Sequence, residues 1–411
     1  MKDTAATVME RCDLLSNITE DAEGICRPYG SQSMREVNNI VSGWMRAAEM
    51  SVRQDSIGNL VGRYGGNGEK TLVLGSHLDT VRNAGKYDGI LGVLLAVACV
   101  EELHAKNRKL PFAVEVVGFA DEEGLRFGTT YLGSSVYAGD FDPARLALAD
   151  RNETTLLRAV RDFGGDPEAL VGGGRSGEDL IGYCEVHIEQ GPVLEAMDLP
   201  VGVVTGIQGQ SRIQAGFTGV AGHAGTVPMN GRRDALCAAA EFVLEVERAA
   251  RAEPPAVATV GEIRALPGAS NVIPAETRLA VDLRHPDDVS RVRLRDGLRR
   301  RAEDIAKERS CDNSWQVRQE TAAIPMDERM TAKLAQAVER AGYPAHRLPS
   351  GAGHDAAQLA ALTAPAMLFV RCKDGISHNP AESVTKGDVG VALDVLGHFV
   401  ELLAENEENG S

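Results

Sequence analysis

The sequence has few aromatic residues, scattered cysteines and no long apolar run. Phe, Trp and Tyr together make up 4% of the 411 residues, so smaller aliphatic side chains must pack the core. The seven cysteines contain no C-x-x-C pair, which argues against a disulfide framework and fits a reducing cytosol. The N-terminus lacks an apolar signal core, and the longest apolar run, "ILGVLLAVACV", is too short to span a bilayer. We therefore expect a cytoplasmic protein.

Basic charge is also scarce. The chain has 43 Lys and Arg residues against 59 Asp and Glu, which gives a net charge of −16. A chain this acidic repels nucleic acid and anionic membranes unless it carries a local basic patch. The densest basic run, residues 291–309, also contains acids at helical spacing and is typical of a solvated helix face. We expect neither nucleic acid nor a membrane as a partner.

The first half of the chain alternates strand-like and helix-like segments. Apolar runs typical of buried strands occur at residues 70–79, 111–124, 182–191 and 200–209, and a helical run occupies residues 89–107. Similar alternation resumes after Pro325. This pattern predicts an α/β domain with a mixed, largely parallel sheet.

The pattern changes near Ser211. Strand-like and helical segments then follow in the order β-α-β-β-α-β, which is typical of a small α+β, split-βαβ domain. We expect this smaller domain at residues 211–323, inserted as a lid and dimerisation domain into a larger one formed by residues 1–210 and 324–411. An edge strand of its antiparallel sheet could pair with a second copy, so we expect a homodimer.

Titratable residues gather where the predicted strands end. The clusters are "SHLD" with the later "YDG", "FADEEG", "EVHIEQG" and "DGISHNPAE". A single histidine or acid at a strand end is more often structural than functional. Ligands in α/β sheets bind beyond the carboxyl ends of the strands, so four such clusters together indicate one site.

The residue types in these clusters suit a metal. Imidazole and carboxylate are the usual ligands of catalytic Zn²⁺ and also suit Mn²⁺, and a carboxylate can bridge two ions. An Asp two residues after a ligating His can orient that imidazole, as Asp79 could for His77. Of two adjacent acids, such as Glu122 and Glu123, one can bind metal while the other acts as a base. The residue types therefore predict a hydrolytic site that binds one or two divalent metal ions, Zn²⁺ or Mn²⁺.

The order of these motifs resembles the M20 metallopeptidase superfamily. The stretches "EVHIEQGPVLE", "VVTGIQG", "GHAGTVPM", "NVIP", "VDLRHPD", "GAGHDA" and "GISHNPAE" are similar to its amidase branch, which contains allantoate amidohydrolases, N-carbamoyl-L-amino acid hydrolases and β-ureidopropionases. The resemblance runs from about Arg53 to His398. Peptidases of the superfamily typically carry an acid where this chain has His187, so that residue favours the amidase branch.

The resemblance implies a role for each residue of the clusters. Asp88 is expected to bridge the two ions, with His77 and His187 on one ion and Glu123 and His378 on the other. Glu122 is expected to be the general base that deprotonates the attacking water and returns the proton to the leaving nitrogen. Asp79 is expected to orient His77.

Substrate-binding residues are expected mainly from the inserted domain. The resemblance implies that Arg284 grips a substrate carboxylate, although an ion pair with Asp282 or Asp287 would also explain it. His223 is expected to stabilise the oxyanion, reaching over from a partner subunit. Asn271 and Gln190 are expected to form further hydrogen bonds with the substrate, and Gly353 is expected to let the backbone approach it closely. His354 lies beside this glycine and could contact the ligand, support the metal ligands from behind or belong to a helix N-terminus.

The implied reaction is hydrolysis of a C–N bond in a linear ureido acid, with ammonia and CO₂ among the products. "DTVRNAGKYDG" and "FADEEGLRFGTTYLGS" look more like allantoate amidohydrolases, so we expect allantoate, a purine-degradation intermediate, and a ureidoglycine- or ureidoglycolate-type product. N-carbamoyl-L-amino acids and β-ureidopropionate remain alternatives, as does a dipeptidase or aminoacylase. A non-catalytic binding protein would be expected to lose a ligand or Glu122, and neither is lost.

Overall fold

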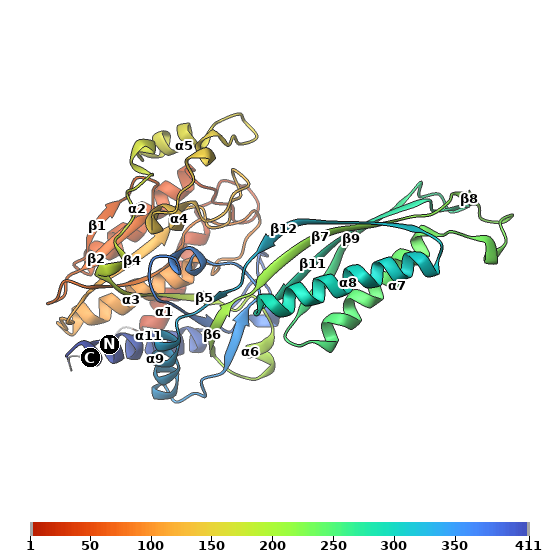
Figure 1. The fold of residues 1–411 in the computed structure, drawn as a ribbon. Coiled ribbons are helices and arrows are strands. Elements are labelled where there is room, and N and C mark those ends of the chain that lie inside the picture. The colour runs from red at the N-terminus through yellow and green to blue at the C-terminus, as the bar shows by residue number, and fades with distance from the viewer. Residues whose placement is uncertain (1–2, 409–411) are drawn as a thin grey trace. The chain divides into compact units, whose positions relative to one another are not determined.

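The chain folds into two compact units. The computed structural model describes residues 3–408, and the chain passes from one unit to the other between Thr205 and Gly206 and again between Pro325 and Met326 (Figure 1). The two N-terminal residues and residues 409–411, which belong to the predicted larger domain and its tail, lie outside the described part.

The larger unit is built on a mixed sheet with the order β1-β2-β4-β3-β5-β15-β6-β13, with β14 beside β6. The neighbours β4, β3, β5 and β15 are parallel to one another, whereas the pairs on either side of them are antiparallel. This confirms the predicted mixed, largely parallel sheet. The strands of this sheet are β1 (Ser51–Gln54), β2 (Leu60–Tyr64), β3 (Thr71–His77), β4 (Ala113–Phe119), β5 (Leu180–Ile188), β6 (Val201–Ile207), β13 (Ile324–Pro325), β14 (Arg347–Ser350) and β15 (Pro365–Val370), of which β13 and the last two residues of β6 fall within Gly206–Pro325.

Helix α3 (Ile90–Ala105) forms the centre of the larger core. Twelve of its 16 residues are buried, because it packs on β3 and β5 and is covered by α1 and α11. A helix that is apolar on every side must lie inside the protein, as the run "ILGVLLAVACV" indicates. The other helices of this unit are α1 (Thr4–Ser16), α2 (Gln32–Ala47), α4 (Leu132–Ala138), α5 (Leu156–Phe163), α6 (Val193–Ala196), α9 (Glu328–Arg340), α10 (Ala356–Leu359) and α11 (Lys386–Glu408).

The four parallel strands determine where the site can form. Their carboxyl ends meet at one edge of the sheet, so the segments that follow β3, β4, β5 and β15 leave the sheet side by side. These are the segments that carry the histidine and acid clusters of the sequence.

The smaller unit is an antiparallel sheet in the order β12-β7-β11-β9 with two helices on one face (Figure 1). Its elements are β7 (Gly209–Thr218), α7 (Ala235–Ala252), β9 (Val257–Leu266), β11 (Glu276–His285), α8 (Asp288–Glu308) and β12 (Asp312–Thr321). A short ribbon of β8 (Gly222–His223) and β10 (Val272–Ile273), which the sequence did not indicate, joins this unit as well.

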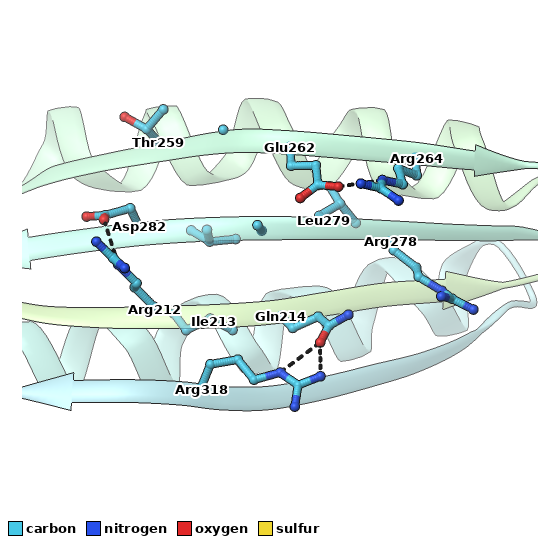
Figure 2. Close-up of a pocket in the computed structure, with 13 residues that line it drawn as sticks. Arg212, Ile213, Gln214, Thr259, Glu262, Arg264, Arg278, Leu279, Asp282 and Arg318 are labelled. Carbon is cyan, nitrogen blue, oxygen red and sulfur yellow. Dashed lines mark hydrogen bonds and ion pairs between the residues drawn. The ribbon is translucent and has the colours of Figure 1, made fainter. Parts of the chain in front are cut away.

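The sheet of the smaller unit has two different faces. Along β11, the side chains of Thr277, Leu279, Val281 and Leu283 are buried, and Leu279 and Val281 pack with α7 and α8 in an apolar core. The alternate positions form an open polar face with a groove of about 590 Å³, which is lined by Arg212, Arg264, Arg278, Arg318, Glu262 and Asp282 among others (Figure 2).

Two further expectations concern the whole described chain. All seven cysteines are free thiols, in agreement with the absence of a disulfide framework. Between residues 3 and 408 no helix has the length and apolar character that crossing a bilayer requires.

Candidate active site

Five predicted metal ligands come together at the carboxyl edge of the parallel strands. His77 is the last residue of β3, and His187 is the penultimate residue of β5. Asp88 lies just before α3, whereas Glu123 follows β4 and His378 follows β15. Their side chains form two groups in which all potential ligand atoms lie within 4.8 Å of one another: His77, Asp88 and His187, and then Asp88, Glu123 and His378.

Asp88 belongs to both groups, and each of its oxygens faces a different one. Oδ1 lies 3.1 Å from Nε2 of His187 and 3.9 Å from Nε2 of His77. Oδ2 lies 3.1 Å from Nε2 of His378, which is itself 3.3 Å from Oε1 of Glu123. A carboxylate that presents one oxygen to each of two ligand sets has the geometry needed to bridge two cations.

A glycine makes room for this arrangement. Gly89 has a φ of +68°, and a Cβ atom there would overlap the imidazole ring of His77. Only glycine combines a left-handed conformation with such a close approach. The "YDG" motif therefore places Asp88 beside His77 because its glycine has no side chain.

The two buried imidazoles are oriented by backbone carbonyl groups. Nδ1 of His77 lies 3.1 Å from the carbonyl oxygen of Asp79, and Nδ1 of His187 lies 2.9 Å from that of Ile188. A carbonyl oxygen only accepts hydrogen bonds, so each Nδ1 must carry the proton. Each Nε2 therefore faces Asp88, and its lone pair would be available to a metal ion bound between them.

The charge of the cluster fits divalent cations. Across residues 3–408 no lysine or arginine pairs with Asp88, Glu122 or Glu123, although all three carboxylates are buried or nearly so. Burial alone would lower the pKa of His77, but Asp79, Glu122 and Asp88 raise it well above its ordinary value. Buried carboxylates are unfavourable unless positive charge lies beside them, and bound metal ions would supply that charge.

Asp79 aligns the pair of glutamates. Its Oδ1 accepts the backbone N–H of Glu122 at 3.0 Å, and its Oδ2 accepts that of Glu123 at 3.1 Å. Oδ1 is also 3.6 Å from Nδ1 of His77, whose closer partner is the Asp79 carbonyl. Asp79 therefore connects the segment after β3 with the segment after β4, in addition to contacting the histidine as expected.

Glu122 has the surroundings of a general base. Its side chain is 7% exposed and lies with His77 and Glu123 in a third compact group. Burial raises the pKa of Glu122 well above its ordinary value; His77 opposes this shift and Glu123 adds to it. A carboxylate with a raised pKa can hold a proton between two steps of a reaction at neutral pH.

Glu382, in the motif "GISHNPAE", is a supporting residue that sequence reasoning missed. It is 3% exposed, and its Oε1 accepts the backbone N–H groups of Tyr87 at 2.8 Å and Asp88 at 3.1 Å. Its Oε2 accepts the hydroxyl of Ser377 at 3.0 Å, and that hydroxyl is also 3.1 Å from Oδ2 of Asp88. Glu382 thus connects the Asp88 turn to the segment that carries His378.

Gln190 and His354 also lie in the larger unit. Nε2 of Gln190 donates to Oδ2 of Asp88 at 3.0 Å, so this predicted substrate residue contacts a predicted metal ligand. His354 is 2% exposed; its ring packs edge-on against that of His187 with centroids 4.4 Å apart, and its Nε2 lies 2.8 Å from the Ser350 hydroxyl. A Cβ atom at Gly353 would overlap the Tyr131 hydroxyl, so the glycine is needed for local packing.

The remaining predicted substrate residues belong to the smaller unit. His223 and Asn271 are neighbours on the β8–β10 ribbon, where the Ala224 N–H donates to the Asn271 carbonyl at 2.9 Å. Arg284 lies on the polar face of the sheet and forms an ion pair with Asp282, with Nε and Oδ1 2.8 Å apart. This is the pairing that its alternative interpretation predicted.

Histidines and carboxylates around a buried acid, at the carboxyl edge of an α/β sheet, define a metal-dependent hydrolase. Comparison with known proteins agrees. The profile of Peptidase family M20/M25/M40 matches residues 73–402, and the chain belongs to this family. Within it the chain is an amidohydrolase, a hydrolase that acts on C–N bonds other than peptide bonds.

Relatives and solved structures cover almost the full chain. It is 40% identical to an N-carbamoyl-L-amino acid amidohydrolase of Geobacillus stearothermophilus, over 93% of this chain and 94% of that protein. It is 38% identical to a probable allantoate deiminase of Oryza sativa subsp. japonica, over 93% of this chain and 85% of that protein. A crystal structure of a hydantoinase/carbamoylase family amidase from Burkholderia multivorans superposes with a TM-score of 0.91 at 32% identity, over 96% and 97% of the two chains.

Proposed function

We propose that the protein hydrolyses a C–N bond of a linear ureido acid, and that its substrate is allantoate. The observation that carries this proposal is His187, an imidazole beside Asp88 where peptidases of the superfamily typically have an acid. Relatives named allantoate deiminase from rice and Arabidopsis thaliana, each 38% identical, support the choice of substrate. The specific alternative is an N-carbamoyl-L-amino acid, because a relative so named is 40% identical.

The proposed reaction consumes one water. A water molecule adds to the ureido carbonyl, the bond to one nitrogen breaks, and the carbamate formed divides into CO₂ and an amine or ammonia. From allantoate the products are ureidoglycine, ammonia and CO₂. Divalent ions, when bound, would polarise the carbonyl and make the water more acidic.

The residues of the larger unit have complementary roles in this proposal. Glu122 takes the proton of the attacking water and delivers it to the leaving nitrogen, and its raised pKa supports both steps. His77, His187, Glu123 and His378 would hold two ions, Zn²⁺ or Mn²⁺, with Asp88 between them. Asp79 keeps the two glutamates in register.

The smaller unit would recognise the substrate. We assign the substrate carboxylate to Arg284, because guanidinium binds carboxylate at two points. His223 would stabilise the oxyanion as the carbonyl carbon becomes tetrahedral, with Asn271 beside it on the same ribbon. In this assignment residues 1–210 and 324–411 form the catalytic domain, and residues 211–323 form the lid and dimerisation domain.

The experiment that tests the function is a substrate panel. Metal-loaded protein is incubated separately with allantoate, several N-carbamoyl-L-amino acids, β-ureidopropionate and dipeptides, and released ammonia and amine are quantified. We expect the highest kcat/KM for allantoate and no hydrolysis of dipeptides, with Glu122→Gln protein as the inactive control. Preferential hydrolysis of N-carbamoyl-L-amino acids would establish the alternative, and cleavage of dipeptides alone would refute the proposal.

We also propose a homodimer that forms through β9. This strand lies at the edge of its sheet, and Val257, Ile263 and Leu266 on it are 54%, 46% and 41% exposed. Unpaired edges with exposed apolar side chains favour pairing with another strand. Ile263→Glu should shift the protein from dimer to monomer in light scattering, whereas Val317→Glu on the opposite edge strand β12 should not.

The seven free cysteines support a reducing, cytoplasmic environment.

A further inference from the structure

Asp282 binds the arginine that we assign to the substrate carboxylate. Asp282 and Arg284 are two residues apart on β11, so both side chains lie on the open face of the sheet. Nε of Arg284 donates to Oδ1 at 2.8 Å, and Nη2 donates to Oδ2 at 3.1 Å. Two parallel hydrogen bonds fix the plane of a guanidinium as well as its position.

The carboxylate of Asp282 is itself held by the neighbouring strand. Gln210 and Arg212 lie on β7, directly across from Arg284 and Asp282. Nε2 of Gln210 donates to Oδ2 of Asp282 at 2.6 Å. Nε of Arg212 lies 3.6 Å from the same oxygen, and Figure 2 shows this pair of Arg212 and Asp282. Asp282 therefore cannot rotate freely, and its orientation is passed on to Arg284.

The pair is half-buried and charged. The side chains of Arg284 and Asp282 are 31% and 32% exposed. Burial alone would raise the pKa of Asp282, but the hydrogen bond and charge of Arg284, the hydrogen bond from Gln210 and the charge of Arg212 lower it below its ordinary value. The carboxylate of Asp282 is therefore ionised at neutral pH, where it pairs with the guanidinium of Arg284.

We propose that Asp282 is a positioning residue for substrate recognition, which holds the guanidinium of Arg284 in the plane that a substrate carboxylate requires. The inference rests on the proposed function of Arg284 and deepens it. A flexible arginine loses side-chain entropy when it binds a carboxylate, and one that is already oriented loses less. Asp282 thus contributes to the selection of acids over uncharged ureido compounds.

The same strand provides a matched control. Glu276 and Arg278 have the same spacing on β11, with Nε and Oε1 2.6 Å apart. Arg278 is 58% exposed, and this second pair lies six residues nearer the start of the strand than the proposed recognition residues. Glu276→Gln removes the same charge from an equivalent pair that has no proposed role.

The test compares an acid with its uncharged analogue. For the holoenzyme and the variants Asp282→Asn, Asp282→Glu, Arg284→Ala and Glu276→Gln, kcat and KM are measured with the preferred ureido acid and with its carboxamide. The readout is the ratio of the two kcat/KM values. A general effect on folding or on the metal ions changes kcat/KM by the same factor for both substrates, so it leaves this ratio unchanged.

We expect Arg284→Ala to abolish the preference for the acid. Asp282→Asn should reduce the preference about tenfold, which is a typical effect of one residue on a neighbour that it contacts. The reduction should appear as a higher KM for the acid, with kcat nearly unchanged. Asp282→Glu keeps the charge and should restore most of the preference, and Glu276→Gln should match the wild type.

Four results would overturn the inference. An equal loss with acid and carboxamide in Asp282→Asn would make Asp282 purely structural. A lower KM for the acid in that variant would mean that Asp282 competes with the substrate for Arg284. Hydrolysis that keeps its preference for acids in Arg284→Ala would leave the ureido hydrolase function intact but remove both residues from recognition. If no ureido acid is hydrolysed by the wild type, the proposed function fails and the inference fails with it.

Discussion

Replacement of Glu382 by alanine should weaken metal binding as well as stability. In the wild type one carboxylate oxygen accepts the N–H groups of Tyr87 and Asp88, and the other accepts the Ser377 hydroxyl. Removal of the carboxylate leaves two buried N–H groups without their acceptor, which costs roughly 2–5 kcal/mol of unfolding free energy. It also removes the Glu382 connection between the Asp88 turn and the segment that carries His378, although the contact of Ser377 with Asp88 remains.

Metal affinity should fall because Asp88 and His378 are then held less firmly relative to each other. Loss of a residue that orients metal ligands typically weakens binding about 10–100-fold. At a fixed concentration of free metal well above Kd, this removes about 1.4–2.8 kcal/mol of the stabilisation that one bound ion provides. Glu382→Ala should therefore lose more stability in metal-loaded protein than in metal-free protein.

The assay is denaturant unfolding with and without Zn²⁺ or Mn²⁺, combined with a chelator competition that measures affinity. Glu189→Ala is the matched control, because Glu189 is 8% exposed and accepts two backbone N–H groups, from Val193 at 2.8 Å and Leu194 at 3.0 Å, at the start of α6. We expect the control to lose stability equally in both states. If Glu382→Ala also does so, with unchanged metal affinity, Glu382 is only structural and the reasoning is wrong.

Three further predictions concern the site and its surroundings. Glu122→Gln should lower kcat by about 10²–10⁴-fold with metal content unchanged, whereas Glu123→Gln should lower metal content, and elemental analysis beside kinetics separates the two. Gly89→Ala should displace the ring of His77 and weaken metal binding in the same chelator competition, because its Cβ would overlap the imidazole. Asp150→Asn should lower stability at neutral pH by about 1–2 kcal/mol, because its carboxylate accepts two backbone N–H groups and an arginine. The pKa of Asp150 is lowered in the fold, so this difference should be complete above about pH 4 and vanish as the pH falls further, which unfolding curves at several pH values would show.

Much of the fold was predictable because apolar periodicity reflects burial. The strand with "TLVLGSH" and the helix with "ILGVLLAVACV" are buried on every side, because only a position inside the protein removes such apolar runs from water. The parallel order then requires the ends of β3, β4, β5 and β15 to meet. Sequence position alone could therefore indicate that His77 and His187 lie near each other.

The supporting contacts were not predictable in the same way. Glu382 and Asp88 are 294 positions apart, and their contact depends on two turns whose relative placement no local pattern records. Asp79 was expected to orient His77, yet its carboxylate oxygens accept the N–H groups of the two glutamates. These two hydrogen bonds depend on the alignment of β3 with β4. The β8–β10 ribbon was missed because paired segments of two residues each are too short to show alternation.

Anomalous X-ray diffraction from crystals of the metal-loaded protein, recorded at the absorption edge of the bound metal, would show whether the cluster around Asp88 holds two ions. We predict two peaks on either side of Asp88, one within bonding distance of His77 and His187 and the other within bonding distance of Glu123 and His378. A single peak, or a peak within the neighbouring group of Glu185, His187 and His354, would contradict it.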